Sequence, residues 1–286
     1  MFRRQPRNSE ETERQGSVGL ITHLHPKSPA SEAFRTLRTN LRFSAAAVPG
    51  GLTLMVITSA GPMEGKSTVA SNLAIANAQS GQHVLLVDAD LRRPMQHRIF
   101  RRSNRDGLTT YLIRPYLKPA ALVQSSDAKG LDLITAGPVP PNPAELIASP
   151  RMAGLFAWAK DAYDLVVVDA PPVLAVTDAL LLAEQTDGVA LVARAGVTKN
   201  EALQRAKEAL QHPGVHLLGV ILNDVRYRGS DAYYYSYYYS THSTEDGATA
   251  AGDEKWQGAH SHGADRGEVA ADLSAPSSDG NVGRRT

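Results

Sequence analysis

One short turn of the chain carries the residue types that bind the phosphates of a nucleotide. Residues 60–67 read Ala-Gly-Pro-Met-Glu-Gly-Lys-Ser, which fits a P-loop with alanine at the first glycine position. In such a loop, backbone N–H groups converge on phosphate oxygens, the lysine reaches the β- and γ-phosphates, and the serine hydroxyl ligates Mg²⁺. The turn therefore predicts binding of ATP and Mg²⁺ by Gly61, Met63, Glu64, Gly65, Lys66, Ser67 and Thr68.

Three aspartates lie where two apolar runs end. Asp88 ends the run HVLLVD, Asp90 follows two residues later, and Asp169 ends the run YDLVVVD. The carboxyl ends of parallel strands share the edge where a P-loop lies, so Asp88 and Asp169 are both expected to approach the γ-phosphate. One carboxylate would hold Mg²⁺ and the other would accept a proton from an attacking hydroxyl, and the spacing does not decide which is which. Asp90 could support the metal, and simple capping of the next helix is the alternative for each aspartate.

A tyrosine cluster follows the last apolar run, among serine, aspartate and glycine and with no helix or strand period. Tyrosine normally buries its ring, but these rings are expected to be accessible to solvent, where they could accept a phosphoryl group. A tether of about ten residues spans about 35 Å, enough to reach a neighbouring subunit. An adhesive aromatic segment or an edge strand is the alternative, because a P-loop alone indicates an NTPase and not a kinase. The expected acceptors are Tyr227, Tyr233, Tyr234, Tyr235, Tyr237, Tyr238 and Tyr239.

The elements that must position these residues alternate along the chain. Short apolar runs without alternation predict buried strands at 52–58, 83–88, 131–136, 163–169, 188–194 and 215–223. Helical patterns lie between most of them, and a further helix is expected from Ser28 or Ser31 to about residue 45. These patterns predict an α/β, three-layer P-loop NTPase fold, in which helices cover both faces of a mainly parallel sheet. A strand before the turn and a helix after it also argue against an accidental glycine-rich turn.

Composition divides the chain into four parts. We expect a flexible arm at 1–28, the P-loop domain at 29–225, the tyrosine cluster at 226–240 and a disordered tail at 241–286. The formal net charge of +1 gives no argument for nucleic-acid binding, and the absence of cysteine excludes disulfides and thiolate metal sites. No apolar run approaches the roughly 20 residues that cross a bilayer. We therefore expect a cytoplasmic protein that reaches the inner face of a membrane only through a partner.

Longer motifs add a family resemblance over residues 28–239. The stretches VLLVDADLR and VVVDAPP, the segment AGPVPPNPAELIAS and the tyrosine cluster resemble those of the bacterial tyrosine kinases of capsule and exopolysaccharide synthesis. In that family the first two stretches are the Walker A′ and Walker B motifs, and the cluster is autophosphorylated. The likeness is closest to the type whose kinase is a separate chain from its membrane activator. It implies an ATP-dependent protein-tyrosine kinase.

The resemblance also assigns roles to single residues. It implies that Asp88 is the base that activates tyrosine, and that Asp90 and Asp169 organise Mg²⁺ with Ser67 while Lys66 binds the phosphates. Asn223, at the end of the last strand, is expected to touch the adenine. Met63 stands where many relatives carry glycine, so the loop is expected to be less pliant.

The resemblance further implies partners. Glu32, Arg35 and Arg38 match the family's E-x-x-R-x-x-R motif, which contacts the next subunit of a ring in which each tail reaches a neighbour's site. Without the resemblance, this spacing would indicate only a solvated helix face. The other implied partners are a membrane-embedded polysaccharide co-polymerase that activates the kinase and a tyrosine phosphatase.

Two other functions are compatible with a P-loop. The first is an ATPase switch of the partition or septum-placement type without phosphotransfer, but those ATPases carry a lysine early in the loop, where this chain has Gly61. The second is a scaffold that binds nucleotide and presents tyrosines to another kinase. The complete set of Lys66, Ser67, Asp88 and Asp169 argues against a scaffold.

Overall fold

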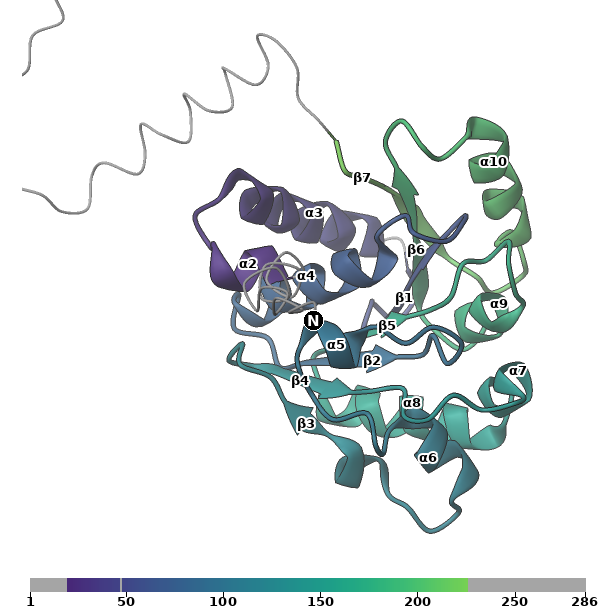
Figure 1. Cartoon of the computed structure of the whole chain (residues 1–286). Coiled ribbons are helices and arrows are strands. Elements are labelled where there is room, and N and C mark those ends of the chain that lie inside the picture. Colours follow the sequence, from purple (N-terminus) through teal and green to yellow (C-terminus); the bar gives the residue numbers. More distant parts are fainter. Residues whose placement is uncertain (1–19, 47, 226–286) are drawn as a thin grey trace, which may run out of the picture. The chain divides into compact units, whose positions relative to one another are not determined.

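A seven-stranded sheet forms the centre of the protein (Figure 1). The computed structural model describes residues 20–46 and 48–225, so the tyrosine cluster and the expected tail lie outside it. The strand order is β3-β4-β2-β5-β1-β6-β7, and every neighbouring pair is parallel except β3 with β4. The strands are β1 Leu54–Ser59, β2 Val84–Asp88, β3 Gln124–Ser125, β4 Leu131–Ile134, β5 Leu165–Asp169, β6 Gly188–Arg194 and β7 Leu217–Asn223.

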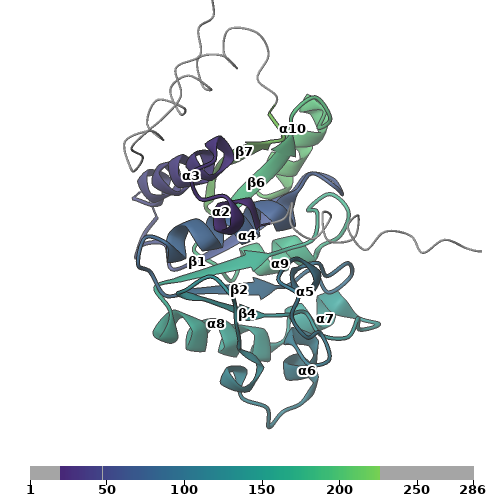
Figure 2. The same cartoon turned by 60° about the vertical axis from the view of Figure 1, so that its left-hand side comes forward.

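Helices cover both faces of this sheet, and each face has its own apolar core (Figure 2). One core is completed by α2 Ile21–Leu24, α3 Pro29–Ala45, α4 Lys66–Ala78 and α5 Gln96–Ile99. The other is completed by α6 Leu108–Ile113, the 3-10 helix η2 Pro119–Leu122, α7 Pro143–Ile147, α8 Pro150–Ala162, α9 Asp178–Ala183 and α10 Asn200–Ala209. Every residue of β1, β2 and β5 is buried, which explains why these strands show no polar alternation. The predicted three-layer α/β fold is confirmed.

The amino-terminal boundary differs from the prediction. Part of the expected flexible arm forms helix α2, which packs on α4. The backbone N–H of Thr22 donates to Asn72 Oδ1 over 2.9 Å, and Gln79 Nε2 donates to the carbonyl of Thr22 over 3.0 Å. The side-chain amides of Asn72 in α4 and of Gln79, which caps the C-terminus of α4, thus hold a helix of only four residues. Ser28 caps α3, because its Oγ accepts from the N–H of Ser31 over 3.2 Å.

Candidate active site

The P-loop joins the end of β1 to the start of α4. Gly65 precedes the first helical residue with φ +89°, in the left-handed region that favours glycine. A Cβ at this position would lie 2.1 Å from Nδ2 of Asn223 at the end of β7. Both the backbone conformation and the close approach therefore require glycine, and they leave room for a phosphate to reach the helix N-terminus.

Glu64 holds the loop by both its backbone and its side chain. Its carboxylate accepts from the N–H of Gly61 over 2.9 Å and from Thr198 Oγ1 over 2.5 Å, and its carbonyl accepts from Asn223 Nδ2 over 2.9 Å. Asn223 thus lies beside the loop, and its contact with adenine stays a prediction. Thr198 was not identified from the sequence, because it lies 134 residues from its partner Glu64.

Met63 has a backbone conformation that is unfavourable for a residue with a Cβ. Its φ is +63°, where residues with a Cβ are disfavoured, and its side chain is 85% exposed. The loop thus adopts at Met63 a backbone conformation that glycine takes without strain. The exposed side chain gains little burial in return.

Lys66 lies among the predicted catalytic carboxylates. Its Nζ is 2.8 Å from Asp90 Oδ2, 3.1 Å from Asp169 Oδ1 and 3.2 Å from Ser67 Oγ. Burial alone would lower the pKa of the Lys66 ammonium, but the charges of Asp169 and Asp90 outweigh burial and raise that pKa above its usual value. The lysine is therefore charged, and ATP phosphates would compete with two carboxylates for it.

Asp88 and Asp169 are register partners at the ends of β2 and β5. Oδ2 of Asp88 accepts from the N–H groups of Met95 and Gln96 over 3.0 and 2.9 Å, whereas its buried Oδ1 has no hydrogen-bond partner among the described residues. Burial, and then the charge of Asp169, raise the pKa of the Asp88 carboxyl well above its usual range. An unpartnered, buried carboxylate oxygen with a raised pKa is suited to accept a proton.

Two further residues of the β2–α6 connection belong to this site and were not predicted. Gln96 is fully buried, and its Nε2 donates to Asp169 Oδ2 over 2.7 Å. Arg92 binds the buried Asp178 with two parallel hydrogen bonds of 2.9 and 3.0 Å. Arg92 is the last residue of the VLLVDADLR stretch, although the sequence alone assigned it no role. The one sequence signal for Gln96 is its position shortly after that stretch, in the segment that passes the ends of β2 and β5.

The residues present fit MgATP. The left-handed Gly65 lets the loop lead into the N-terminus of α4, and Oδ1 of Asp88 has no hydrogen-bond partner among the described residues. The hydroxyl of Ser67 adds an oxygen ligand of the type that Mg²⁺ prefers. The described residues contain no group of three or more His, Asp or Glu side chains that could hold a metal alone. Phosphate and water oxygens would therefore supply most of the ligands of Mg²⁺.

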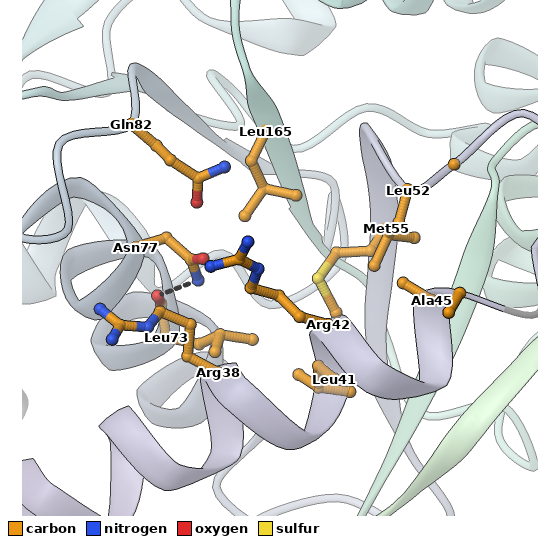
Figure 3. Close-up of a pocket in the computed structure, with 12 residues that line it drawn as sticks. Arg38, Leu41, Arg42, Ala45, Leu52, Met55, Leu73, Asn77, Gln82 and Leu165 are labelled. Carbon is orange, nitrogen blue, oxygen red and sulfur yellow. Dashed lines mark hydrogen bonds between the residues drawn. The ribbon is translucent and has the colours of Figure 1, made fainter.

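The three residues of the expected subunit interface lie on α3, away from the P-loop. Glu32 and Arg35 form an ion pair, Arg35 also donates to the carbonyl of Pro26, and Arg38 donates to the carbonyl of Ala76 over 2.8 Å. Arg38 also lines a hollow of about 280 Å³ between α3, α4 and the amino ends of β1 and β5 (Figure 3). These contacts lie within one chain, so the interface stays a prediction.

Comparisons with known proteins agree with this fold and show the family. The model of the CobQ/CobB/MinD/ParA nucleotide binding domain matches residues 55–245. The tyrosine-protein kinase YwqD of Bacillus subtilis is 48% identical over 204 residues, which cover 71% of this chain and 85% of YwqD. The tyrosine-protein kinase etk of Escherichia coli is 40% identical over 229 residues, which cover 80% of this chain but only 31% of that longer relative.

Solved structures give the same result. The kinase domain of Escherichia coli tyrosine kinase ETK matches with a TM-score of 0.70 at 38% identity, covering 80% of this chain and 85% of that one. The chimerical protein CapA2B2 matches with a TM-score of 0.69 at 38% identity, covering 77% of this chain and all of that one. In the described part of this chain, no helix is both long and apolar enough to cross a membrane. The chain therefore belongs to the CobQ/CobB/MinD/ParA nucleotide-binding family and, within it, to the P-loop tyrosine-protein kinases.

Proposed function

We propose that this kinase transfers the γ-phosphoryl group of ATP to the tyrosines of its own C-terminal cluster, in a second copy of the chain, and so regulates the synthesis and export of exopolysaccharide or capsule. The observation that carries the proposal is the unpartnered Oδ1 of Asp88, buried at the catalytic edge beside the charges of Lys66 and Asp169. A P-loop ATPase that only hydrolyses ATP needs no base for a phenol. A tyrosine hydroxyl, with a pKa of about 10, benefits from one.

The reaction uses groups that the site already orients. Asp88 accepts the proton of the tyrosine hydroxyl while the phenolic oxygen bonds to the γ-phosphorus and the bond to the β-phosphate oxygen breaks, releasing ADP. Lys66 and the N–H groups of the loop stabilise the negative charge on the transferring group. Ser67, Asp90 and Asp169 would hold Mg²⁺, which when bound neutralises phosphate charge.

Assembly and activation extend the same proposal. Glu32, Arg35 and Arg38 would contact the next subunit of a ring, which would place each tyrosine cluster near a neighbour's site. A membrane-embedded polysaccharide co-polymerase would recruit the cytoplasmic chain to the membrane and activate it, and a tyrosine phosphatase would reverse the modification. The motif resemblance supports these partners, and the exposed position of α3 is compatible with a further subunit.

The test is incubation of the full chain with γ-labelled ATP and Mg²⁺, with and without a candidate activator segment. Lys66→Met and a variant with Phe at all seven cluster tyrosines serve as comparisons. Alkali-stable label on the wild type that is absent from both variants supports the proposal. ATP hydrolysis without protein label, even with the activator present, would instead indicate a switch ATPase.

A further inference from the structure

Gln96 contacts three parts of the edge of the sheet where β2 and β5 end, here called the catalytic edge, through its buried side chain and its backbone N–H. Its N–H donates to Asp88 Oδ2 over 2.9 Å, and its Nε2 donates to Asp169 Oδ2 over 2.7 Å and to the carbonyl of Ser67 over 3.1 Å. Its Oε1 lies 2.7 Å from the hydroxyl of Ser71. One residue at the start of α5 thereby contacts the end of β2, the end of β5 and the first turn of α4.

The surroundings fix which way the amide faces. The groups beside Nε2 are a carboxylate and a backbone carbonyl, which can only accept hydrogen bonds, so the NH₂ end must face them. On the other side, Ser71 can donate its hydroxyl proton to Oε1. A flipped amide would set its oxygen against Asp169 and the Ser67 carbonyl. The orientation is therefore determined by chemistry as well as by packing.

Gln96 also determines which carboxylate oxygens are left for the reaction. It occupies Oδ2 of Asp88 and Oδ2 of Asp169, so that Oδ1 of Asp88 stays free and Oδ1 of Asp169 faces Lys66. Since the two aspartates are register partners on adjacent strands, their like charges would push the carboxylates apart without a donor that binds both. Gln96 supplies such donors from one rigidly buried residue.

We propose that Gln96 is a positioning residue of the kinase, which orients Asp88 and Asp169 relative to the P-loop without touching the reacting atoms. This inference rests on the proposed role of Asp88. Replacing a residue that hydrogen-bonds to a catalytic or metal-binding side chain and orients it typically lowers activity by about 10–100-fold. Replacing the Gln96 side chain is expected to affect kcat in this way because the side chain orients Asp169 against Ser67. The backbone N–H to Asp88 remains in every variant, and so do the loop N–H groups and Lys66, which bind the triphosphate.

Asn77 provides a matched control. It is another buried amide, it lies on α4, and its Nδ2 donates to the carbonyl of Leu73 over 2.8 Å, far from the catalytic carboxylates. Gln96→Leu and Asn77→Leu therefore make the same chemical change in the same helical layer. Gln96→Glu and Asn77→Asp repeat the pair with nearly unchanged volume.

The experiment compares these variants in the full chain, together with Asp88→Asn. The measurements are kcat and KM for ATP in tyrosine phosphorylation, binding of a fluorescent ATP analogue with and without Mg²⁺, and the midpoint of thermal unfolding. We expect Gln96→Leu and Gln96→Glu to lower kcat by about 10–100-fold with little change in analogue binding or KM. Asn77→Leu and Asn77→Asp should lower the unfolding midpoint but keep kcat per nucleotide-binding site.

Ser71→Ala provides a milder test should both Gln96 variants fail to fold. It removes a hydroxyl that lies 2.7 Å from Oε1 of Gln96 and 2.7 Å from the carbonyl of Ser67, but it leaves both donors of Gln96 to the carboxylates, so it should lower kcat by a smaller factor. The inference is overturned if any folded Gln96 variant keeps the wild-type kcat per nucleotide-binding site. If neither Gln96 variant folds, it is overturned if Ser71→Ala keeps that kcat. So does a loss of kcat that matches the loss of analogue binding. Failure of the proposed function gives a different result: a wild type without tyrosine phosphorylation, or an Asp88→Asn variant with full activity.

Discussion

Asp88 and Asp169 end adjacent parallel strands as direct register partners, which places two fully buried carboxylates side by side. Of the two, Asp169 contacts the ammonium of Lys66, as does Asp90. Burial and the charge of Asp169 raise the pKa of the Asp88 carboxyl, and its buried Oδ1 has no hydrogen-bond partner within the part of the chain that the structure describes, which suits the proposed role of Asp88 as the base. The geometry thus distinguishes the two strand-end aspartates, which their spacing in the sequence does not.

Asp88→Asn should separate catalysis from stability. The amide keeps the shape and the acceptor for the N–H groups of Met95 and Gln96 but cannot take a proton, so tyrosine phosphorylation should fall by about 10²–10⁴-fold. Removing a buried negative charge beside Asp169 should leave the unfolding midpoint unchanged or raise it. Phosphorylation and thermal unfolding are measured together. The control is Asp164→Asn, because Asp164 lies outside the site and also accepts a hydrogen bond from a backbone N–H, that of His83. If the unfolding midpoint falls in Asp88→Asn but not in Asp164→Asn, the proposed repulsion between Asp88 and Asp169 is wrong.

Lys66→Met should have the opposite effect on stability. Among the described residues, the substitution removes the one cationic side chain that contacts Asp90 and Asp169, both of which are buried. Breaking a buried ion pair by removing one partner costs about 3–5 kcal/mol. The free energy of unfolding in denaturant should fall by this order, and phosphorylation should be lost. Equal stability of Lys66→Met and wild type would show that the two ion pairs contribute nothing, and Asp88→Asn would in either case be the cleaner inactive reference.

Tyr163 should make stability fall at high pH. Burial, and then the charge and hydrogen bond of Asp132, raise the pKa of the Tyr163 hydroxyl; His83 is the other titratable group that faces this pair. As pH rises above about 10, the unfolded chain loses this proton while the folded chain keeps it, so the folded state loses stability. The unfolding midpoint of Tyr163→Phe should therefore vary less with pH between about 9 and 11. A pH slope of Tyr163→Phe equal to that of the wild type would contradict this role of the Tyr163 hydroxyl.

Much of the fold could be predicted because its signals are local. Buried parallel strands have continuous apolar runs, and the turn before Lys66 contains its own glycine and lysine pattern. The positions of Asp88 and Asp169 followed from the rule that parallel strands end at one edge. Strand β3 was missed because two residues carry no period, and it pairs antiparallel with β4 at the edge of the sheet.

The supporting contacts of the site could not be predicted, because they join residues that are distant in the sequence. Gln96 lies 73 residues from Asp169, and Thr198 lies 134 residues from Glu64. Neither residue belongs to a motif, and an amide or a threonine in a connecting segment is usually only polar surface. Their roles arise only in the folded protein, where separate segments of the chain come together at the carboxyl ends of the parallel strands. The tyrosine cluster and the ring interface remain predictions, since the cluster lies outside the described residues.

Met63→Gly should stabilise the loop slightly. A left-handed residue with a Cβ costs roughly 1–2 kcal/mol, and the extra freedom of glycine in the unfolded chain offsets about 0.5–1 kcal/mol of the gain. The expected result is an increase of about 0–1.5 kcal/mol in the free energy of unfolding, with kinase activity kept. Arg101→Gly, at φ +53°, tests the same relief away from the P-loop. A less stable Met63→Gly beside a more stable Arg101→Gly would show that the methionine side chain makes a contact that outweighs its strain.

Gly65→Ala should cost more than its backbone angle alone explains. Gly65 and Gly81 have φ of +89° and +93°, but a Cβ at Gly81 meets nothing within 4 Å, whereas at Gly65 it would lie 2.1 Å from Asn223 Nδ2. Gly81→Ala should therefore lower the free energy of unfolding by the conformational cost alone, about 1–2 kcal/mol. Gly65→Ala should lower it further, because the new Cβ also displaces Asn223 from the carbonyl of Glu64.

A double-mutant cycle separates these two contributions. In an Asn223→Ala background, Gly65→Ala should cost no more than Gly81→Ala in the free energy of unfolding, because the clash is gone. Binding of a fluorescent ATP analogue should stay weakened in the double variant, since the alanine still disfavours the loop conformation that presents its N–H groups to phosphate. If Gly65→Ala costs the same with and without Asn223, the steric role of that side chain is wrong, and the left-handed backbone alone explains why glycine stands at this position.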